Sequence, residues 1–150
     1  MTLINRYASG GQIKGALQLL RKATYPSSDY LKIRDALAPL VAPRQKISDD
    51  ARIMINEIMH NSEADPSTLT SILNDGKAAY QLSPRQDSTY LPYIVSTEKG
   101  LGSTALEDAY QSAPKKPVHL YATPESVGFY RKQPGWVEST EDGISKFTRK

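Results

Sequence analysis

Two glycines stand one residue apart directly before a predicted helix, and a lysine precedes them. The stretch runs Lys99, Gly100, Leu101, Gly102, Ser103, Thr104. Glycines at such a point permit the positive φ angles of a tight turn. The backbone N–H groups and the dipole of a helix start can also bind an anion such as a phosphate, and the Lys99 ammonium and the two hydroxyls would add to that. The spacing matches neither the dinucleotide-binding G-x-G-x-x-G pattern nor a Walker A loop. Both interpretations, chain geometry and phosphate binding, are open from these residues alone.

Composition narrows the class of protein. With 150 residues we expect one domain spanning 1–150, large enough to bury a core. Hydrophobic residues make up 39% of the chain and no stretch is long enough to span a membrane, so we expect no membrane association. The first residues contain no long apolar segment, which argues against a secretory signal, and we expect a cytoplasmic protein.

Charge and metal-binding residues exclude further classes. There is no cysteine, which rules out disulfides, thiolate metal sites and a cysteine nucleophile. His60 and His119 are the two histidines of the chain, so we expect no metal site. The net charge of +3 and the pI near 9.0 are compatible with nucleic-acid binding, but the basic residues are scattered among 16 acidic ones. We therefore interpret the charges mainly as a solubilising surface.

The first half of the sequence predicts four helices. Apolar residues recur with helical spacing in 12–23, in 27–40 with Ser27 or Ser28 as N-cap, and in 48–61 with Ser48 as N-cap. The fourth helix is predicted from Asp65 to Gly76, since Pro66 suits a first helical position and Gly76 a helix end.

The second half predicts strands and helices in alternation. Strands are expected over 77–82, 89–95 and 118–122, with a helix after Gly102, another from Pro124 capped by Thr123, and a final hairpin around a Glu-Asp-Gly turn. Pro92 cannot donate a ladder hydrogen bond, so its strand must be an edge or contain a bulge. A helix between the strands at 89–95 and 118–122 implies a parallel pair. The predicted fold class is α/β (α+β), a mixed, mostly antiparallel sheet with flanking helices.

The stretch from Tyr80 to Phe147 resembles the C-terminal half of the GNAT family of N-acetyltransferases. The family's Q/R-x-x-G-x-G/A phosphate loop corresponds to 97–102, its parallel strand to "HLYAT", and its Phe-Tyr helix and Gly-aromatic pair to Phe129-Tyr130 and Gly135-Trp136. Three departures stand out. Thr97 replaces Gln or Arg, the stretch 129–136 is one residue longer, and four helices with two strands precede the loop where the family has two helices and three strands.

The resemblance implies an enzyme that moves an acetyl group from acetyl-CoA to an amine. The pyrophosphate would lie on the backbone of Lys99, Gly100, Leu101, Gly102, Ser103 and Thr104, and the pantetheine arm along the strand edge of Ile94, Val95 and Ser96. Tyr130 occupies the family's position for the acid that protonates the departing thiolate; packing of this ring in the core is the alternative interpretation. The base stays open among Glu57, Glu98, Glu138 and His119.

The acceptor is not identified by the resemblance. A small molecule, a protein and an aminoacyl-tRNA are all compatible with it, and so is a homodimer. The helical region from 48 to 74 is expected to choose the acceptor, with Lys46, Arg52 and Lys77 near its rim. The alternative function is a catalytically degenerate protein of the same scaffold that binds a protein partner through its helical half.

Overall fold

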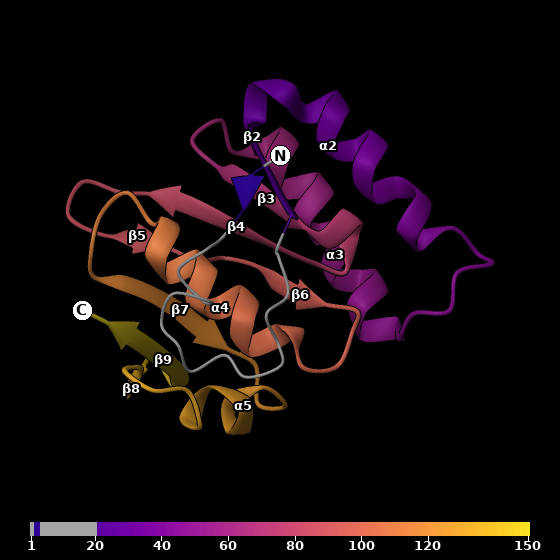
Figure 1. Ribbon diagram of the computed structural model, residues 1–150. Helices are drawn as coiled ribbons and strands as arrows, with labels where there is room; N and C mark the ends of the chain where they lie inside the picture. Colours follow the sequence, from indigo (N-terminus) through magenta and orange to yellow (C-terminus); the bar gives the residue numbers. More distant parts are fainter. Residues whose placement is uncertain (1, 4–20) are drawn as a thin grey trace.

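The computed structural model describes residues 2–3 and 21–150 (Figure 1). Its strands are β1 (Thr2–Leu3), β2 (Arg21–Pro26), β3 (Leu69–Leu73), β4 (Ala78–Pro84), β5 (Thr89–Tyr90), β6 (Ile94–Ser96), β7 (Val118–Ala122), β8 (Val137–Glu141) and β9 (Ile144–Arg149). Its helices are α2 (Tyr30–Leu37), α3 (Asp49–Ala64), α4 (Leu101–Ser112) and α5 (Val127–Arg131), with short 3-10 turns at Ser27–Asp29, Ala38–Val41 and Asn74–Gly76.

The strands form one mixed sheet in the order β1-β2-β3-β4-β5-β7-β9-β8, and β6 continues the line of β5 beside β4. The β5–β7 pair is parallel, and the other pairs are antiparallel. The predicted fold class is therefore confirmed, and so is the parallel pair on either side of α4.

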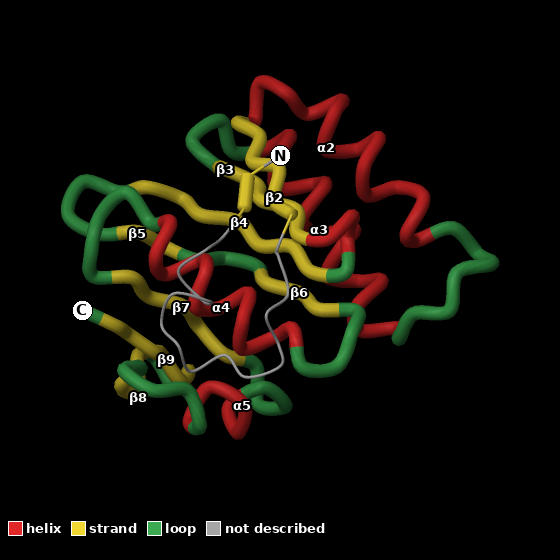
Figure 2. Tube along the Cα trace, in the orientation of Figure 1, coloured by secondary structure: helices red, strands yellow, loops and turns green. Residues whose placement is uncertain are grey.

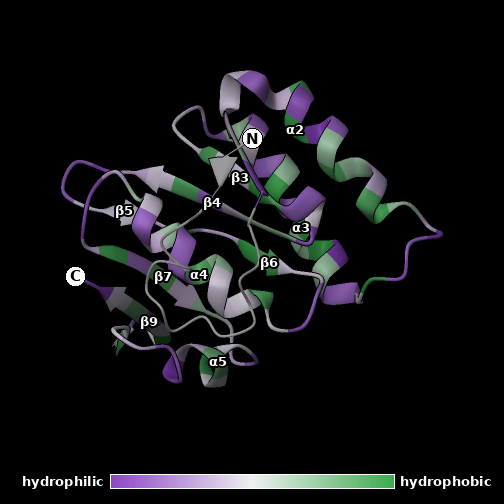
Figure 3. Ribbon diagram, in the orientation of Figure 1, coloured by the Kyte–Doolittle hydropathy of each residue, from purple (hydrophilic) through white to green (hydrophobic). Residues whose placement is uncertain are grey.

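Helices cover the sheet on two sides (Figures 1 and 2). The core between α4 and the sheet contains Tyr80, Leu120 and Phe147, and we call this side of the sheet the α4 face. The core beneath α2 and α3 contains Ala79 and Val95 from the opposite side, which we call the α3 face. Hydrophobic and polar residues alternate along these helices, as expected for elements with one buried side (Figure 3). No helix among the described residues is long and apolar enough to cross a membrane.

The predicted helix over 65–76 is wrong, because the segment contains strand β3. Leu69, Ile72 and Leu73 have helical spacing, but Thr70, Ser71, Ile72 and Leu73 are all buried in a strand between β2 and β4. β-Branched residues favour such a strand, and both of its sides are covered. Asn74, Asp75 and Gly76 then adopt positive φ angles, which turn the chain into β4.

The predicted helix over 12–23 is wrong at its end, where Arg21–Ala23 belong to β2; the rest of that prediction lies outside the described residues. With β3 assigned as a strand, the described residues from 30 to 96 contain α2 and α3 followed by three antiparallel strands, β3, β4 and the divided strand β5–β6. The apparent departure from the family pattern in this region therefore came from the sequence prediction and is absent from the fold.

The other predicted helices are present with shifted ends. The Ser48 hydroxyl caps α3 by accepting the N–H of Ala51, as predicted. α2 begins at Tyr30 without a side-chain cap, and the Ser27 hydroxyl donates instead to the carbonyls of Asp65 and Thr68.

In the second half the predicted order of elements is confirmed. β7 has the predicted bounds, and positive φ angles at Asp142 and Gly143 close the final hairpin. α5 begins at Val127, later than predicted, because Thr123 belongs to a preceding turn in which its carbonyl accepts the Ser126 N–H.

Candidate active site

The strand predicted over 89–95 contains a bulge. Register pairs Tyr80 with Ile94 and Ser83 with Tyr90, so two residues of β4 lie opposite three residues of the neighbouring strand, 91–93. Pro92 is the middle residue of these three and cannot donate a hydrogen bond to the ladder. The predicted bulge at Pro92 is therefore confirmed, and it divides the strand into β5 and β6.

The bulge is also the point at which two parallel strands separate. The N–H groups of Thr89 and Leu91 donate to the carbonyls of Pro117 and His119, at 3.0 and 2.9 Å. Beyond Leu91 the described residues form no further ladder bond between this strand and β7, and β6 pairs with β4. The sheet therefore splits at its middle, and one edge of β6 faces the gap.

Backbone directions decide which groups line that edge. Tyr93 accepts from the N–H of Gln81, and Thr97 donates to the carbonyl of Lys77, so both point toward β4. Backbone groups alternate in direction along an antiparallel strand, so those of Ile94 and Ser96 point into the gap. Val95 points toward β4 with its backbone and lies in the α3-face core with its side chain. Of the three residues predicted to line a pantetheine arm, Ile94 and Ser96 thus have backbone groups that face the gap, and their contact with a cofactor stays a prediction.

Gly100 terminates the loop after β6 and caps α4. Its φ of 91° lies in the left-handed region, and a Cβ placed on it would meet no atom within 4 Å. Glycine is therefore required here for its backbone conformation, as the chain-geometry interpretation predicts. The same conformation leaves the helix start open on the side of the loop.

Gly102 has a different role from the turn role predicted for it. It lies in the first turn of α4 without a positive φ, and a Cβ on it would be 3.3 Å from the Phe129 ring. The missing side chain thus lets α5 approach the start of α4. Phe129 is itself 37% exposed, so its ring covers the start of α4 without being part of the buried core.

The loop before Gly100 is held by its own polar groups. The Thr97 hydroxyl donates to the Lys77 carbonyl, and the Ser96 hydroxyl donates to the Glu98 carbonyl at 2.6 Å. Thr97 therefore anchors the loop to β4 in the place where the family has a longer side chain. Lys99 is exposed and forms no ion pair with the described residues, and Ser103 is exposed in the first turn of α4.

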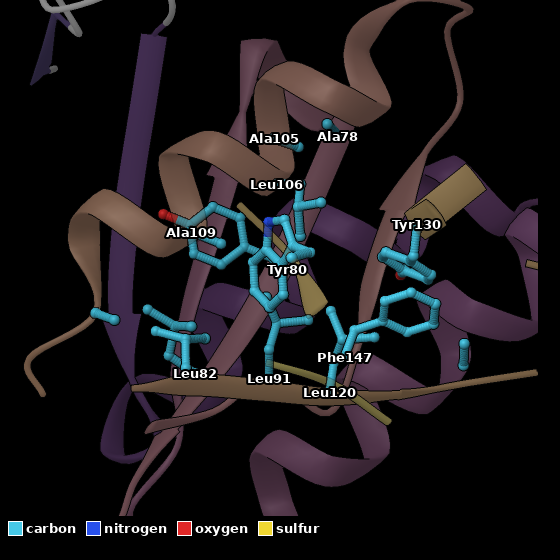
Figure 4. Close-up of a cluster of buried hydrophobic side chains, with 14 of the residues drawn as sticks. Ala78, Tyr80, Leu82, Leu91, Ala105, Leu106, Ala109, Leu120, Tyr130 and Phe147 are labelled. Atoms are coloured by element: carbon cyan, nitrogen blue, oxygen red, sulfur yellow. The ribbon is translucent and has the colours of Figure 1, made fainter. Parts of the chain in front are cut away.

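Tyr130 lies in the α4-face core beside Phe147 (Figure 4). Its ring packs 5.4 Å from that of Phe147, and the residue is 8% exposed. Burial raises the pKa of Tyr130 to about 12, so the phenol is protonated at neutral pH. Its hydroxyl forms no hydrogen bond with a described residue, nor is it fully enclosed. The Tyr130 ring is therefore packed in the core, as the second interpretation predicts. Its hydroxyl has no partner among the described residues, so the first interpretation, an acid, stays open as well.

A buried polar cluster ties α4 to the sheet. The Tyr80 hydroxyl donates to the Asp108 carboxylate at 2.6 Å, and the Lys22 ammonium donates to Asp108 at 3.2 Å and to Ser112 at 2.8 Å. The Asp108 side chain is fully buried and that of Lys22 is 12% exposed. Burial and then the Asp108 charge raise the pKa of Tyr80. Sequence analysis missed this cluster, because residues 22, 80 and 108 carry no shared motif.

Two of the four candidate bases are engaged in ion pairs. Glu98, in the loop before Gly100, lies 3.3 Å from the ammonium group of Lys77. Glu138 accepts two hydrogen bonds from the Arg131 guanidinium, at 2.7 and 3.1 Å, which lower its pKa. Neither carboxylate stands out as a proton acceptor in this arrangement.

The other two candidates lie on the α3 face. His119 stacks on Tyr90, and burial followed by the Lys146 and Arg85 charges lowers its pKa. Glu57, on α3, accepts a 3.4 Å hydrogen bond from Tyr93 in the bulge and forms no ion pair with the described residues. Glu57 therefore differs from the other two carboxylates among the candidates. It contacts the bulge through Tyr93 and has no cationic partner among the described residues.

Arg52, predicted to lie with Lys46 and Lys77 near the rim of the acceptor region, is half-buried. Its guanidinium donates to the carbonyls of Val41, Ala42 and Gln45 and holds the loop between α2 and α3. A role of Arg52, Lys46 and Lys77 toward the acceptor stays a prediction. No group of three or more potential metal ligands occurs among the described residues.

No protein-family model matches this sequence, and no curated protein matches it either. Solved structures do share its fold. An acetyltransferase from Thermus thermophilus aligns with a TM-score of 0.56 at 15% identity, over 87% of this chain and 96% of that one. The PaiA N-acetyltransferase from Thermoplasma acidophilum, solved in complex with coenzyme A, aligns with a TM-score of 0.54 at 15% identity, over 87% and 98%. A protein from Bacteroides thetaiotaomicron assigned to the GNAT acetyltransferases gives 0.56 at 12% identity, over 86% of each chain.

These similarities establish that the chain has the fold of the GNAT acetyltransferases. They extend over most of the chain, so the prediction that the resemblance covers only residues 80–147 is wrong. The error has the same source as the missed strand β3, because the family pattern of the first half becomes visible only when Leu69–Leu73 is a strand.

Proposed function

We propose that this protein transfers an acetyl group from acetyl-CoA to an amine. The split between β6 and β7, which leads directly to the glycine-capped start of α4, carries the proposal. It combines an open strand edge, a helix start suited to phosphate and a protonated phenol within one short region.

The residues around the split fit acetyl-CoA. The turn at Gly100 has open space around it, and the Leu101 N–H donates to the Glu98 carbonyl. The following N–H groups, of Gly102 and Ser103, suit an anionic pyrophosphate, as does the Lys99 ammonium, which has no ion pair with the described residues. Backbone groups of Ile94 and Ser96 suit the amide groups of a pantetheine arm. The bound thioester would supply an activated acyl carbon next to the bulge.

The chemistry asks little of the protein beyond positioning and one proton transfer. A bond forms between the nitrogen of the neutral amine and the acyl carbon, the bond from that carbon to sulfur breaks, and the nitrogen releases one proton to solvent. The Tyr130 hydroxyl donates a proton to the thiolate and regains one from solvent. Since burial keeps this phenol protonated at neutral pH, it is present in the form that a general acid requires.

Two sequence features favoured the alternative function, a degenerate protein that only binds a partner. One was the small number of strands predicted before the glycine loop, but the structure has β3 there as an additional strand of the sheet. The other, Thr97 in place of Gln or Arg, remains, although this residue anchors the loop.

Thermal unfolding with and without acetyl-CoA tests the proposal. A ligand at a hundred times its Kd stabilises a folded protein by about 2.7 kcal/mol, which corresponds to a rise in Tm of roughly 5–10 °C for a chain of this size. Gly102→Val should abolish this rise, since a Cβ there would press on Phe129. Gly128→Val is the matched control, because Gly128 also lies in a helix and has open space around it. Absence of any shift for the unmodified protein at millimolar acetyl-CoA would refute the proposal.

A further inference from the structure

The two faces of β7 have different surroundings. Val118, Leu120 and Ala122 point into the α4-face core, so His119 and Tyr121 point to the α3 face. On that face the core beneath α2 and α3 contains buried residues of β3, β4 and β6. Among the described residues, none of β7 or β9 belongs to this core. This leaves the α3 face of β7 without a helix from residues 21–150 above it.

An aromatic cluster occupies the uncovered area, formed by Tyr90, His119 and Tyr121. Tyr90 and His119 are stacked, with ring centroids 5.1 Å apart and an angle of 18° between the ring planes. Tyr121 stands edge-on to both at 5.9 Å. The Arg85 guanidinium lies over Tyr90, so ring surface is most available on Tyr121, which is 39% exposed. Aromatic side chains exposed together on a sheet are suited to binding a ligand.

The aromatic cluster stands at the split itself. Tyr90 is the last residue of β5 and is paired with His119, directly before the bulge begins. Tyr93 lies within the bulge and packs against the α3-face core, and its hydroxyl donates to Glu57. The α4 face of the same region is filled by Leu91 and Leu120 and by Tyr130. An acceptor can therefore approach the split from the α3 face, across the aromatic cluster.

Charge is ordered along this path. Beside the bulge, Glu57 is exposed and has no cationic partner among the described residues, so it can attract an ammonium group. Farther away, Lys146 approaches the Tyr121 ring and is paired with Glu141 at 3.6 Å, so that end is close to neutral. A ligand with its positive charge at the bulge and an uncharged apolar part over the rings matches this order.

We propose that the acceptor is an amine carried on an aromatic group, with the ammonium form attracted by Glu57 and the ring held by the aromatic cluster. The bound ammonium group releases its proton to solvent before the neutral amine attacks the thioester. This inference rests on the proposed acetyltransferase function and names its substrate class. Aromatic pairs add about 0.5–1.5 kcal/mol beyond the burial of area, which corresponds to roughly a two- to twelvefold preference over an aliphatic amine.

Competing amine substrates provide the test. Initial rates are measured for 2-phenylethylamine and n-butylamine at saturating acetyl-CoA, and we expect kcat/KM to be about tenfold higher for the aromatic amine. Tyr121→Ala should remove most of this preference, because it should lower kcat/KM for 2-phenylethylamine far more than for n-butylamine. Tyr121→Phe retains the ring and should retain the preference.

Ile53→Ala is the control, because it also removes an exposed apolar side chain, on α3 and outside the aromatic cluster. It should change the rate with neither amine. A Tm measurement on each variant confirms that the variant is folded. Glu57→Gln should raise KM for both amines by a similar factor, because both carry the same ammonium group.

The outcomes separate the two proposals. Equal kcat/KM for the two amines, unaffected by Tyr121→Ala, would overturn the aromatic acceptor and leave the acetyltransferase function standing. A Tm shift with acetyl-CoA but no acetylation of either amine would also overturn the aromatic acceptor, because 2-phenylethylamine presents the chemistry proposed. Absence of the Tm shift would refute the acetyltransferase function itself.

Discussion

The two faces of the sheet at the split are built in opposite ways. On the α4 face Tyr80, Asp108 and Lys22 form a buried, mutually satisfied cluster, and Tyr130 packs its ring against Phe147. On the α3 face the rings of β5 and β7 are partly exposed and contact mostly one another. One face holds its groups in place by burial, and the other presents them to solvent.

Under the proposed function, this difference lets one split strand serve two ligands. The donor, common to all acceptors, benefits from a rigid site whose geometry is preorganised before binding. An acceptor must reach the same acyl carbon from outside, which requires an open side. Substitutions on the α4 face should therefore affect stability and chemistry together, whereas those on the α3 face should affect acceptor use alone.

The largest effect is expected from Tyr130→Phe, which keeps the ring and removes the hydroxyl. The rate of the chemical step should fall by about 10²–10⁴-fold, as is typical for loss of an acid–base group. The Tm shift with acetyl-CoA should persist. Wild-type turnover in this variant, measured by release of free thiol, would limit Tyr130 to packing and weaken the contrast between the faces.

The buried cluster should be the next most sensitive feature. Asp108→Asn leaves the Lys22 ammonium without its buried counter-charge, and loss of one partner of a buried pair costs about 3–5 kcal/mol. Urea unfolding measures this cost. Glu107→Gln on the same helix is the control, since Glu107 and Arg149 form a more exposed pair at 2.7 Å, worth at most about 1 kcal/mol. Similar costs for both variants would show that α4 is not held by burial of charge.

Alkaline pH should weaken the α4 face through Tyr130. The folded protein keeps the Tyr130 proton up to a pKa of about 12, whereas the unfolded chain releases it near 10. This contribution is complete below pH 10 and is lost as the pH rises through 12; two pKa units correspond to about 2–3 kcal/mol. Tyr130→Phe should flatten part of the decline in stability above pH 10, measured by urea unfolding at a series of pH values, and an unchanged decline would contradict the burial of this hydroxyl.

The smallest effect is expected at the helix cap. Gly100→Ala places a side chain in a left-handed conformation, which costs about 1–2 kcal/mol, although no atom lies within 4 Å of the new Cβ. Stability should fall slightly, and acetyl-CoA should still raise the Tm. A complete loss of the Tm rise would show that the glycine is needed for ligand approach as well as for its φ angle.

Local signals in the second half of the sequence predicted its elements well. The glycine turn before α4, the Asp-Gly turn of the last hairpin and Pro92 in its strand each act through the conformation of one or two residues. Such effects do not depend on distant contacts, so they can be recognised in the chain itself. The first half lacks comparable signals in Leu69–Leu73, where helical spacing of apolar residues competed with β-branched composition.

The sequence by itself determined the class of fold, the glycine cap and Tyr130 as a candidate acid, because each depends on residue type and local order. Tertiary structure decided that Leu69–Leu73 is a strand, since only its place between β2 and β4 buries both of its sides. Tertiary structure also brought Glu57 to Tyr93 and Tyr90 to His119, residues separated by 36 and 29 positions, because pairing across a split sheet is a non-local contact that no spacing in the chain records.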